Sequence, residues 1–230
     1  MSITPTTLTR AAGLAALAAG LIFIGVQINH PPSDVSSVAT TEWAVRNSLK
    51  VVMAALALAG ITGMYLRQVK RIGVLGLVGW FVLGAGYLVI VSTALISGYV
   101  LPSLADTDPG YVNDVLAAST GNSPTGDIGL LAYVLRVQDF AYLAGGLVFG
   151  IALYRTRILG RWAPGLLAVG GVVTVTLSLL PDAFYRFLAF PNGIAMVGLG
   201  YALWRLARTG TTTRPAPVDG PRAVTTAGVE

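Results

Sequence analysis

Two ionisable residues lie inside a stretch of the chain that is otherwise apolar and long enough to cross a lipid bilayer. The stretch is residues 130–154 (LLAYVLRVQDFAYLAGGLVFGIALY), and it contains Arg136, Gln138 and Asp139. About 20 consecutive apolar residues span a bilayer. Charge at membrane depth is costly and usually faces the interior of a helix bundle or a water-filled cavity. These residues are therefore candidates for a functional site.

A second set of charged residues lies on the helix predicted over residues 42–66. Glu42, Arg46 and Lys50 are four residues apart, and this spacing places their side chains on one face of the helix. Trp43 is predicted to lie at the membrane interface, where this helix enters the bilayer, so this charged face lies in the outer part of the span.

The predicted depths bring these two sets together. At a rise of about 1.5 Å per residue, Lys50 and Arg136 lie roughly 10 Å below the outer membrane surface, and Asp139 lies roughly 15 Å below it. Asn192, at a predicted break in the last helix, reaches a similar depth. The sequence therefore predicts a polar pocket in the outer half of the membrane. The residues predicted to bind a substrate there are Glu42, Arg46, Lys50, Arg136, Gln138 and Asn192.

Such a pocket allows three kinds of function. The basic groups outnumber the acids by one, and the spare positive charge suits the carboxylate or phosphate of a small anionic or amphiphilic solute that is bound or transported. Alternatively, the protein is a membrane-embedded enzyme in which Asp139 is the general acid acting on a lipid-soluble, isoprenoid-like substrate. In the third alternative the protein is a structural or accessory subunit. Its charges then form ion pairs, Asp139 with Arg136 or Lys50 and Glu42 with Arg46.

The composition indicates a membrane protein and excludes several kinds of site. Hydrophobic residues make up 54% of the chain and charged residues only 11%, whereas a soluble domain has about 25% charged residues. The absence of cysteine excludes disulfides, thiolate ligands and cysteine nucleophiles, and the single histidine, His30, excludes a multi-histidine metal site. We expect no metal and no cofactor. The net charge of +5 is attributed to basic loops, so we expect no nucleic-acid partner.

Hydrophobic runs and helix-breaking residues predict a bundle of six transmembrane helices. The first, at residues 11–28, is expected to be retained rather than cleaved as a signal peptide. Thr41 is predicted to cap the second helix, and Pro191 to interrupt the sixth. The predicted spans after the first are residues 42–66, 72–100, 130–154, 162–180 and 184–204.

A short additional helix is predicted in the long loop between the third and fourth spans. Asp108 is a suitable N-cap and Pro109 a suitable first residue for a helix over residues 109–119. This helix would lie on the outer surface or cover the mouth of the bundle. Its apolar stripe is formed by Tyr111, Val112, Val115 and Leu116.

The distribution of charge predicts the orientation of the bundle. The short connections at residues 67–71 and 155–161 contain six basic residues and no acid. Arg186 is the only basic residue near the opposite loops, whose acids are Asp34, Asp106, Asp108, Asp114, Asp127 and Asp182. By the positive-inside rule, both termini lie in the cytoplasm and the long loop lies outside.

These patterns predict an all-α membrane protein of the inner cell membrane. Residues 1–208 form the six-helix transmembrane domain, and residues 209–230 form a disordered cytoplasmic tail rich in Thr, Pro, Gly and Arg. The expected partners are the lipid bilayer, a small-molecule ligand and a second copy of the chain in a homo-oligomer.

Four stretches resemble a group of uncharacterised multi-pass membrane proteins of actinobacteria, namely GVQINHPP, TTEWAVRNSLKVVMAALALAGITGMYLRQ, YRTRILGRWAPGLLAVGG and AFPNGIAMVGLGYALW. The resemblance covers nearly the whole chain and implies a six-helix integral membrane protein with no known activity. In size and helical architecture the chain is also similar to small integral-membrane terpene cyclases. That weaker resemblance matches no specific motif, and it implies Asp139 and Glu42 as the acids.

Overall fold

The computed structural model describes residues 3–177 and 189–209, and every regular element within these ranges is a helix. Three segments there are long and apolar enough to cross a membrane: α1, the 64 residues Thr41–Leu104, and α6. The helices are α1 (Pro5–Gly25), α2 (Val35–Val38), α3 (Thr41–Leu95), the π-helix η1 (Ile96–Val100), α4 (Leu101–Leu104), α5 (Pro109–Ser119), α6 (Leu131–Thr156), α7 (Trp162–Leu177) and α8 (Ala189–Thr209).

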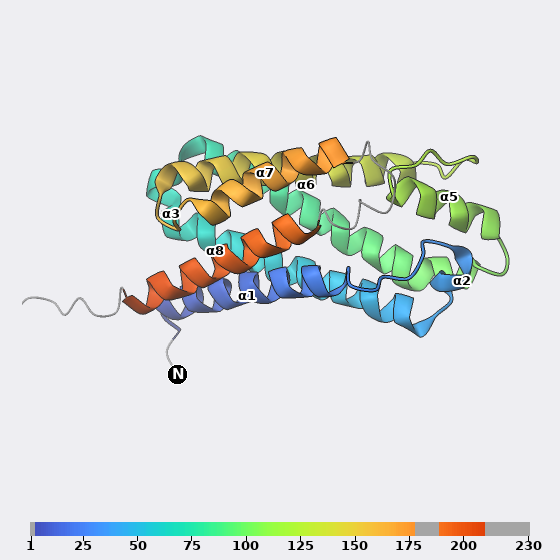
Figure 1. Ribbon diagram of the computed structural model, residues 1–230, viewed down its shortest axis with the longest axis horizontal. Helices are drawn as coiled ribbons and strands as arrows, with labels where there is room; N and C mark the ends of the chain where they lie inside the picture. The colour runs from blue at the N-terminus through green and yellow to red at the C-terminus, as the bar shows by residue number, and fades with distance from the viewer. Residues whose placement is uncertain (1–2, 178–188, 210–230) are drawn as a thin grey trace, which may run out of the picture.

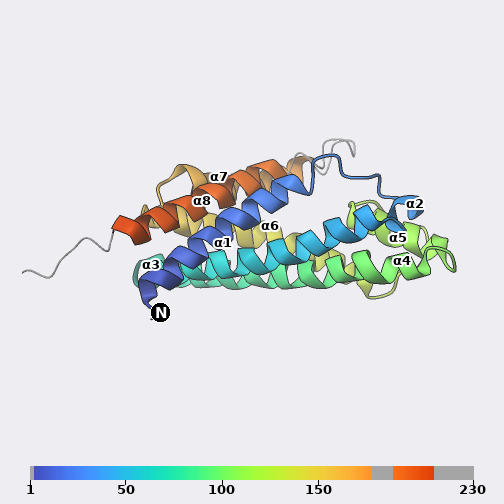
Figure 2. The same cartoon turned by 90° about the horizontal axis from the view of Figure 1, so that it is seen from below.

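The long helix α3 is a hairpin of two antiparallel legs that meet at Gly73 (Figure 2). The backbone there has φ 66° and ψ −171°, a conformation essentially restricted to glycine. Across the hairpin, Trp80 stacks on Tyr65 with ring centroids 5.3 Å apart and donates a hydrogen bond to Thr62 Oγ1 at 3.2 Å. The predicted turn at residues 67–71 is therefore misplaced, because those residues are helical and the chain reverses at Gly73.

The second leg of α3 continues beyond the predicted end of its helix. The predicted span ends at residue 100, just before Pro102, because proline usually terminates a helix. In the structure Pro102 lies in the first turn of α4, and the chain stays helical to Leu104. The π-helix η1 precedes it, with the backbone N–H of Leu101 donating to the carbonyl of Ile96. Proline has no N–H, and the wider π turn accommodates the missing donor without ending the helix.

Capping residues set two helix starts that the hydrophobic pattern misplaced. Helix α1 begins at Pro5 and not near residue 11, because Thr4 caps it and accepts a backbone N–H three residues on at 3.2 Å. The N-cap of α3 is Thr40 and not Thr41, with the equivalent hydrogen bond at 3.3 Å.

Small residues let the helices pack backbone to backbone. A Cβ added to Gly79 on α3 would lie 2.5 Å from the backbone nitrogen of Phe149 on α6. A Cβ on Gly150 of α6 would lie 2.6 Å from the backbone nitrogen of Ala168 on α7. Both contacts are too short for any side chain, so glycine at these positions permits the close approach of neighbouring helices.

The two ends of the bundle differ in charge and in the length of their connections. The N-terminus, the turn of α3 and the α6–α7 connection lie together at one end, and α2, α4 and α5 lie at the other (Figures 1 and 2). We call the first the basic end, because its connections carry Arg67, Lys70, Arg71, Arg155, Arg157 and Arg161. We call the second the acidic end, because its loops carry Asp34, Asp106, Asp108, Asp114 and Asp127.

Helix α5 forms as predicted and builds a second hydrophobic core at the acidic end. Asp108 caps it by accepting the backbone N–H of Tyr111 at 3.1 Å. The predicted apolar stripe packs inwards, with Tyr111 partly buried at its edge. The buried residues of this core are Val38, Trp43, Leu101, Val112, Val115, Leu116 and Ile128.

The last two helices differ from the prediction in their described parts. Helix α8 is continuous through residues 191–193, and Pro191 lies in its first turn, where proline is tolerated. The predicted interruption is therefore absent from the described helix. The predicted helix ends at residues 178–180 and 184–188, the loop charges Asp182 and Arg186, and the predicted tail after Thr209 lie outside the described residues.

Candidate functional site

A cavity of about 660 Å³ lies between the helices towards the acidic end of the bundle. Its volume falls in the range of roughly 300–1,000 Å³ that is typical of small-molecule sites. Its described walls come from α1, both legs of α3, η1, α4, α5, α6 and α8. Because α5 contributes Val115 and Leu116, the short helix forms the cover of the cavity at the acidic end.

The cavity brings together four of the residues singled out in the sequence. Lys50 from the first leg of α3, Gln138 and Asp139 from α6, and Asn192 from α8 all line it. The sequence separation between Lys50 and Asn192 shows that only the folded bundle assembles this set. Whether these residues bind a ligand stays a prediction.

Asp139 is half-buried, and the residues around it in the cavity wall are mostly apolar. On α6 it shares the lining face with Leu135, Tyr142 and Leu143. Among residues 3–177 and 189–209, Asp139 forms no ion pair with either Arg136 or Lys50. The interhelical ion pair considered in the sequence analysis is therefore not formed.

A hydrogen bond between two uncharged side chains links α3 and α6 beside the cavity, in place of the predicted ion pair. Thr93 Oγ1, on the second leg of α3, donates to Gln138 Oε1 on α6. Thr93 lines the cavity beside Gln138. Thr93 was not among the residues predicted from the sequence, although a hydroxyl within the apolar run of residues 74–105 was a signal that could have identified it.

Lys50 lies beside the buried side-chain amide of Asn47, a residue that was also not predicted from the sequence. Lys50 Nζ donates to Asn47 Oδ1 at 3.4 Å, and Asn47 Nδ2 donates to the carbonyl of Trp43 at 3.0 Å. Asn47 is only 1% exposed, and both Asn47 and Lys50 line the cavity. Because Asn47 is held by its own helix, it presents its carbonyl oxygen to the lysine in a fixed position.

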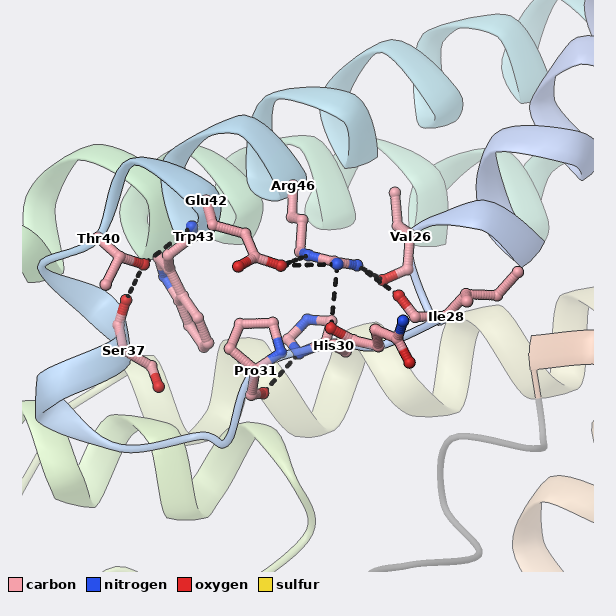
Figure 3. A network of polar contacts seen from close by, with 10 residues as sticks. Val26, Ile28, His30, Pro31, Ser37, Thr40, Glu42, Trp43 and Arg46 are labelled. Atoms are coloured by element: carbon pink, nitrogen blue, oxygen red, sulfur yellow. Dashed lines mark hydrogen bonds and ion pairs between the residues drawn. The ribbon is translucent and has the colours of Figure 1, made fainter.

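Arg46 fixes the end of α1 and does not line the cavity (Figure 3). Its guanidinium donates to the carbonyls of Val26 at 2.8 Å, Ile28 at 3.0 Å and Asn29 at 3.0 Å. It also pairs with Glu42 at 2.7 Å. The last carbonyls of a helix lack partners within the helix, so Arg46 caps α1 and joins it to α3. The predicted Glu42–Arg46 pair is therefore formed, but it lies within α3, and the other bonds of Arg46 join α3 to the end of α1.

Arg136 also lies outside the cavity. Its side chain is exposed on the outward face of α6, between the exposed apolar residues Tyr133, Val137 and Phe140. Arg136 and Asp139 are three residues apart, yet one faces outwards and the other faces the cavity. Of the predicted binding residues, Glu42, Arg46 and Arg136 are thus placed apart from Lys50, Gln138 and Asn192.

An aromatic pair forms the wall of the cavity next to α2. His30 lies edge-on to Trp43 with ring centroids 5.6 Å apart, and His30 Nδ1 is 2.9 Å from the carbonyl oxygen of Pro31 (Figure 3). Trp43 Nε1 donates to the carbonyl of Ser97 at 2.9 Å. Trp43 is 3% exposed, so it is a core residue of the acidic end and not the membrane-interface residue predicted from the sequence.

Within the described part of the chain, the lining combines the cation of Lys50, the carboxylate of Asp139 and several amides and hydroxyls with larger apolar walls. Lys50 can bind an anionic group by a charge-assisted hydrogen bond, and Gln138 and Asn192 can accept or donate further bonds. Such a lining suits a molecule with one polar group on an apolar body. Comparison of the chain with protein-family models, with curated proteins and with solved structures found no match.

Proposed function

We propose that the protein is a multi-pass cell-membrane protein that binds a small amphiphilic solute in the cavity near its acidic end. The observation that carries this proposal is the joint presence of Lys50 and Asp139 on the wall of a largely apolar cavity of about 660 Å³. Charged side chains are rare in membrane-spanning helices and mark ligand or ion pathways when they face a cavity.

The solute is proposed to be anionic at its polar end. Lys50 supplies the positive charge, and the amides of Gln138 and Asn192 supply neutral hydrogen bonds to the same group. The apolar walls, among them Met53 and Leu135, then contact the body of the solute. Burial of that apolar surface contributes about 25 cal/mol per Å².

Six transmembrane spans with both termini in the cytoplasm are part of the proposal. The two legs of α3 add one span to the three apolar segments, and α7 and α8 add two. The clustering of arginines and lysine at one end and aspartates at the other supports an inward-facing basic end. The cavity then opens towards the outside of the cell, beneath α5.

Thermal stability of the detergent-purified protein tests this proposal. The wild type is heated with and without a panel of fatty-acid, isoprenoid-phosphate and neutral isoprenoid compounds. A ligand present at about 100 times its Kd is expected to stabilise the folded state by about 2.7 kcal/mol. Lys50→Met should remove the response to anionic compounds.

Arg136→Gln is the matched control, because it removes one positive charge at a similar depth without touching the cavity. It should leave the ligand response within about twofold of the wild type. An equal loss of response in Lys50→Met and Arg136→Gln would show that the effect is general electrostatics, and it would contradict the assignment of the cavity.

Asp139 favours a second candidate, a membrane-embedded enzyme acting on an isoprenoid-like substrate. A carboxyl group that faces a largely apolar cavity and has no ion pair among the described residues has the surroundings of a general acid. In this case Asp139→Asn should abolish turnover of an isoprenoid phosphate followed by product analysis, and it should retain ligand-dependent stabilisation. Loss of both would assign Asp139 to binding.

A further inference from the structure

A second cavity lies at the basic end, between the turn of α3 and the end of α6. Its volume is about 480 Å³, and it shares no lining residue with the cavity near the acidic end. We call it the basic notch. It is lined by Arg71, Ile72, Gly73, Val74, Leu75, Ala152 and Arg155.

Two arginines from different helices converge on the basic notch. Arg71 ends the first leg of α3, and Arg155 lies in the last turn of α6. Within the part of the chain that the structure describes, neither guanidinium forms an ion pair with a carboxylate. The sequence has no acid between Glu42 and Asp106, so α3 beyond its first turn supplies no negative charge to balance them.

The turn of α3 adds backbone polarity to the basic notch. The second leg of the hairpin begins at Val74, directly after the non-helical Gly73. A helix N-terminus carries a partial positive charge and exposed N–H groups. A Cβ on Gly73 would meet no atom within 4 Å, so the backbone is openly accessible there.

The apolar rim of the basic notch identifies the source of the anion. Val74 is 77% exposed and Leu75 is 38% exposed, and both lie beside the arginines. Leu66 is 61% exposed and precedes Arg71 on the first leg of α3. A free phosphate makes no use of such a surface, whereas the acyl chains of a phospholipid cover it while the phosphate contacts the guanidinium groups.

We propose that the basic notch binds the phosphate of an anionic phospholipid from the leaflet at the basic end. Arg71 and Arg155 hold the phosphate oxygens from two sides, and the lipid thereby joins the α3 hairpin to α6. Basic pockets between transmembrane helices on the cytoplasmic side are suited to such headgroups. This site is independent of the cavity near the acidic end, so either proposal can fail without the other.

Native mass spectrometry and thermal stability of the full chain test the proposal with short-chain phospholipids. The probes are dioctanoyl phosphatidylglycerol, dioctanoyl phosphatidylcholine and inorganic phosphate. The wild type should bind phosphatidylglycerol roughly tenfold more tightly than phosphatidylcholine, and the double variant Arg71→Gln/Arg155→Gln should lose that preference.

The double variant Arg67→Gln/Arg157→Gln is the matched control. It removes the same charge from the same end, and neither residue lines the basic notch. Its preference for phosphatidylglycerol should stay within about twofold of the wild type. An equal loss of preference in both double variants would overturn the site in favour of diffuse surface charge. Stabilisation by inorganic phosphate as strong as that by phosphatidylglycerol would overturn the lipid as its ligand.

Discussion

The two ends of the bundle contain the same hydrogen bond in different surroundings. At the basic end, Thr156 Oγ1 of α6 donates to Gln68 Oε1 of α3, and Gln68 is 2% exposed. Towards the acidic end, Thr93 of α3 donates to Gln138 of α6, and Gln138 lines the cavity. In the first pair the glutamine is buried and lines neither cavity, so its role is to stabilise the contact of α3 with α6. The second pair leaves the amide of Gln138 accessible to a ligand.

The spacing of α3 and α6 accounts for this difference. A Cβ on Gly79 would lie 2.5 Å from the backbone of Phe149, whereas one on Gly86, nearer the cavity, would lie 3.0 Å from the backbone of Tyr142. A Cβ on Gly145 of α6 would lie closer still to the backbone nitrogen of Leu83, so the two helices are closest from Gly79 to Leu83 and less close at Gly86, next to the cavity. The cavity near the acidic end depends on this looser packing, because a cavity needs space that close packing removes.

The largest predicted effect concerns this spacing. Gly79→Ala should lower the free energy of unfolding by about 3 kcal/mol, because the added methyl group collides with backbone atoms that cannot move aside. Gly86→Ala should cost about 1 kcal/mol, since its neighbour is farther away. Unfolding in increasing concentrations of sodium dodecyl sulfate measures both.

Gly84→Ala is the control for helix propensity, because its Cβ would meet only the side chain of Leu58 at 3.6 Å. This variant should be neutral or slightly more stable than the wild type. Equal costs for Gly79→Ala and Gly86→Ala would remove the proposed difference between the two ends.

The next prediction tests whether Arg46 contributes to stability as a helix cap and not to ligand binding. Arg46→Met should destabilise the protein by about 2 kcal/mol, because three carbonyls at the end of α1 lose their donor. Arg46→Lys should recover only part of this, since a lysine lacks the planar fork of donors. The affinity of the remaining folded protein for ligand should not change, because Arg46 is outside the cavity. A ligand affinity lowered tenfold in Arg46→Lys would contradict this separation.

A smaller effect compares the two glutamines directly. Gln68→Leu should lower the free energy of unfolding by about 1 kcal/mol, the size of an interhelical hydrogen bond in a membrane protein. Gln138→Leu should cost a similar amount and also weaken ligand-dependent stabilisation. Thermal unfolding with and without ligand distinguishes the two. A ligand response that changes equally in both variants would show that Gln138 has no special access to the ligand.

The smallest effect is confined to the loop at the acidic end. Asp114 accepts hydrogen bonds from the backbone N–H of Thr125 at 2.7 Å, from its hydroxyl at 2.9 Å and from the N–H of Gly126 at 3.0 Å. The bond from the Thr125 backbone contributes most to lowering the pKa of Asp114 below its ordinary value of 3.8. A lowered pKa stabilises the loop above the unfolded-state pKa, and this contribution is lost as pH falls through the folded-state pKa.

Hydrogen exchange measures this effect. Protection of the Thr125 and Gly126 amides, corrected for the intrinsic rate, should be constant above about pH 5 and decrease below about pH 4. In Asp114→Asn the protection should be lower throughout and nearly independent of pH. A pH dependence unchanged in the variant would assign the titration to another group.

Helices whose ends are marked by local capping residues could be predicted from the sequence, whereas features set by packing between helices could not. Helix α5 was confirmed at both ends, because Asp108 and Pro109 form a start signal that acts within one turn. Gly73 was not recognised as the turn of α3, because four polar or basic residues shortly before it gave a stronger signal for a loop. Its positive φ and the open space around it distinguish Gly73 from the other glycines of α3, and neither can be read from the sequence.

For the candidate site, the sequence indicated how far along its helix each residue lies, but not the direction in which its side chain points. Lys50, Arg136 and Asp139 were placed in one layer from their distance along the helices, and of these Lys50 and Asp139 line the cavity. Arg136 faces elsewhere, since the rotation of a helix is set by its neighbours. With an apolar surface both towards the lipid and towards the bundle, the hydrophobic pattern does not reveal which face is inside.

The single-residue turn at Gly73 bears on how the chain is inserted during synthesis. The first leg of α3 carries Arg46 and Lys50, which oppose transfer into the bilayer, whereas residues 74–105 contain no charge. With no loop between them, the two legs enter most favourably as a pair, and the second leg offsets the cost of the first. Because α1 alone would anchor a shorter chain, the readout is the first leg itself: it should be cleaved by added protease in a chain that ends at residue 73 and protected in one that continues beyond residue 105. The biogenesis of this protein would then have the α3 hairpin, and not the single helix, as its unit.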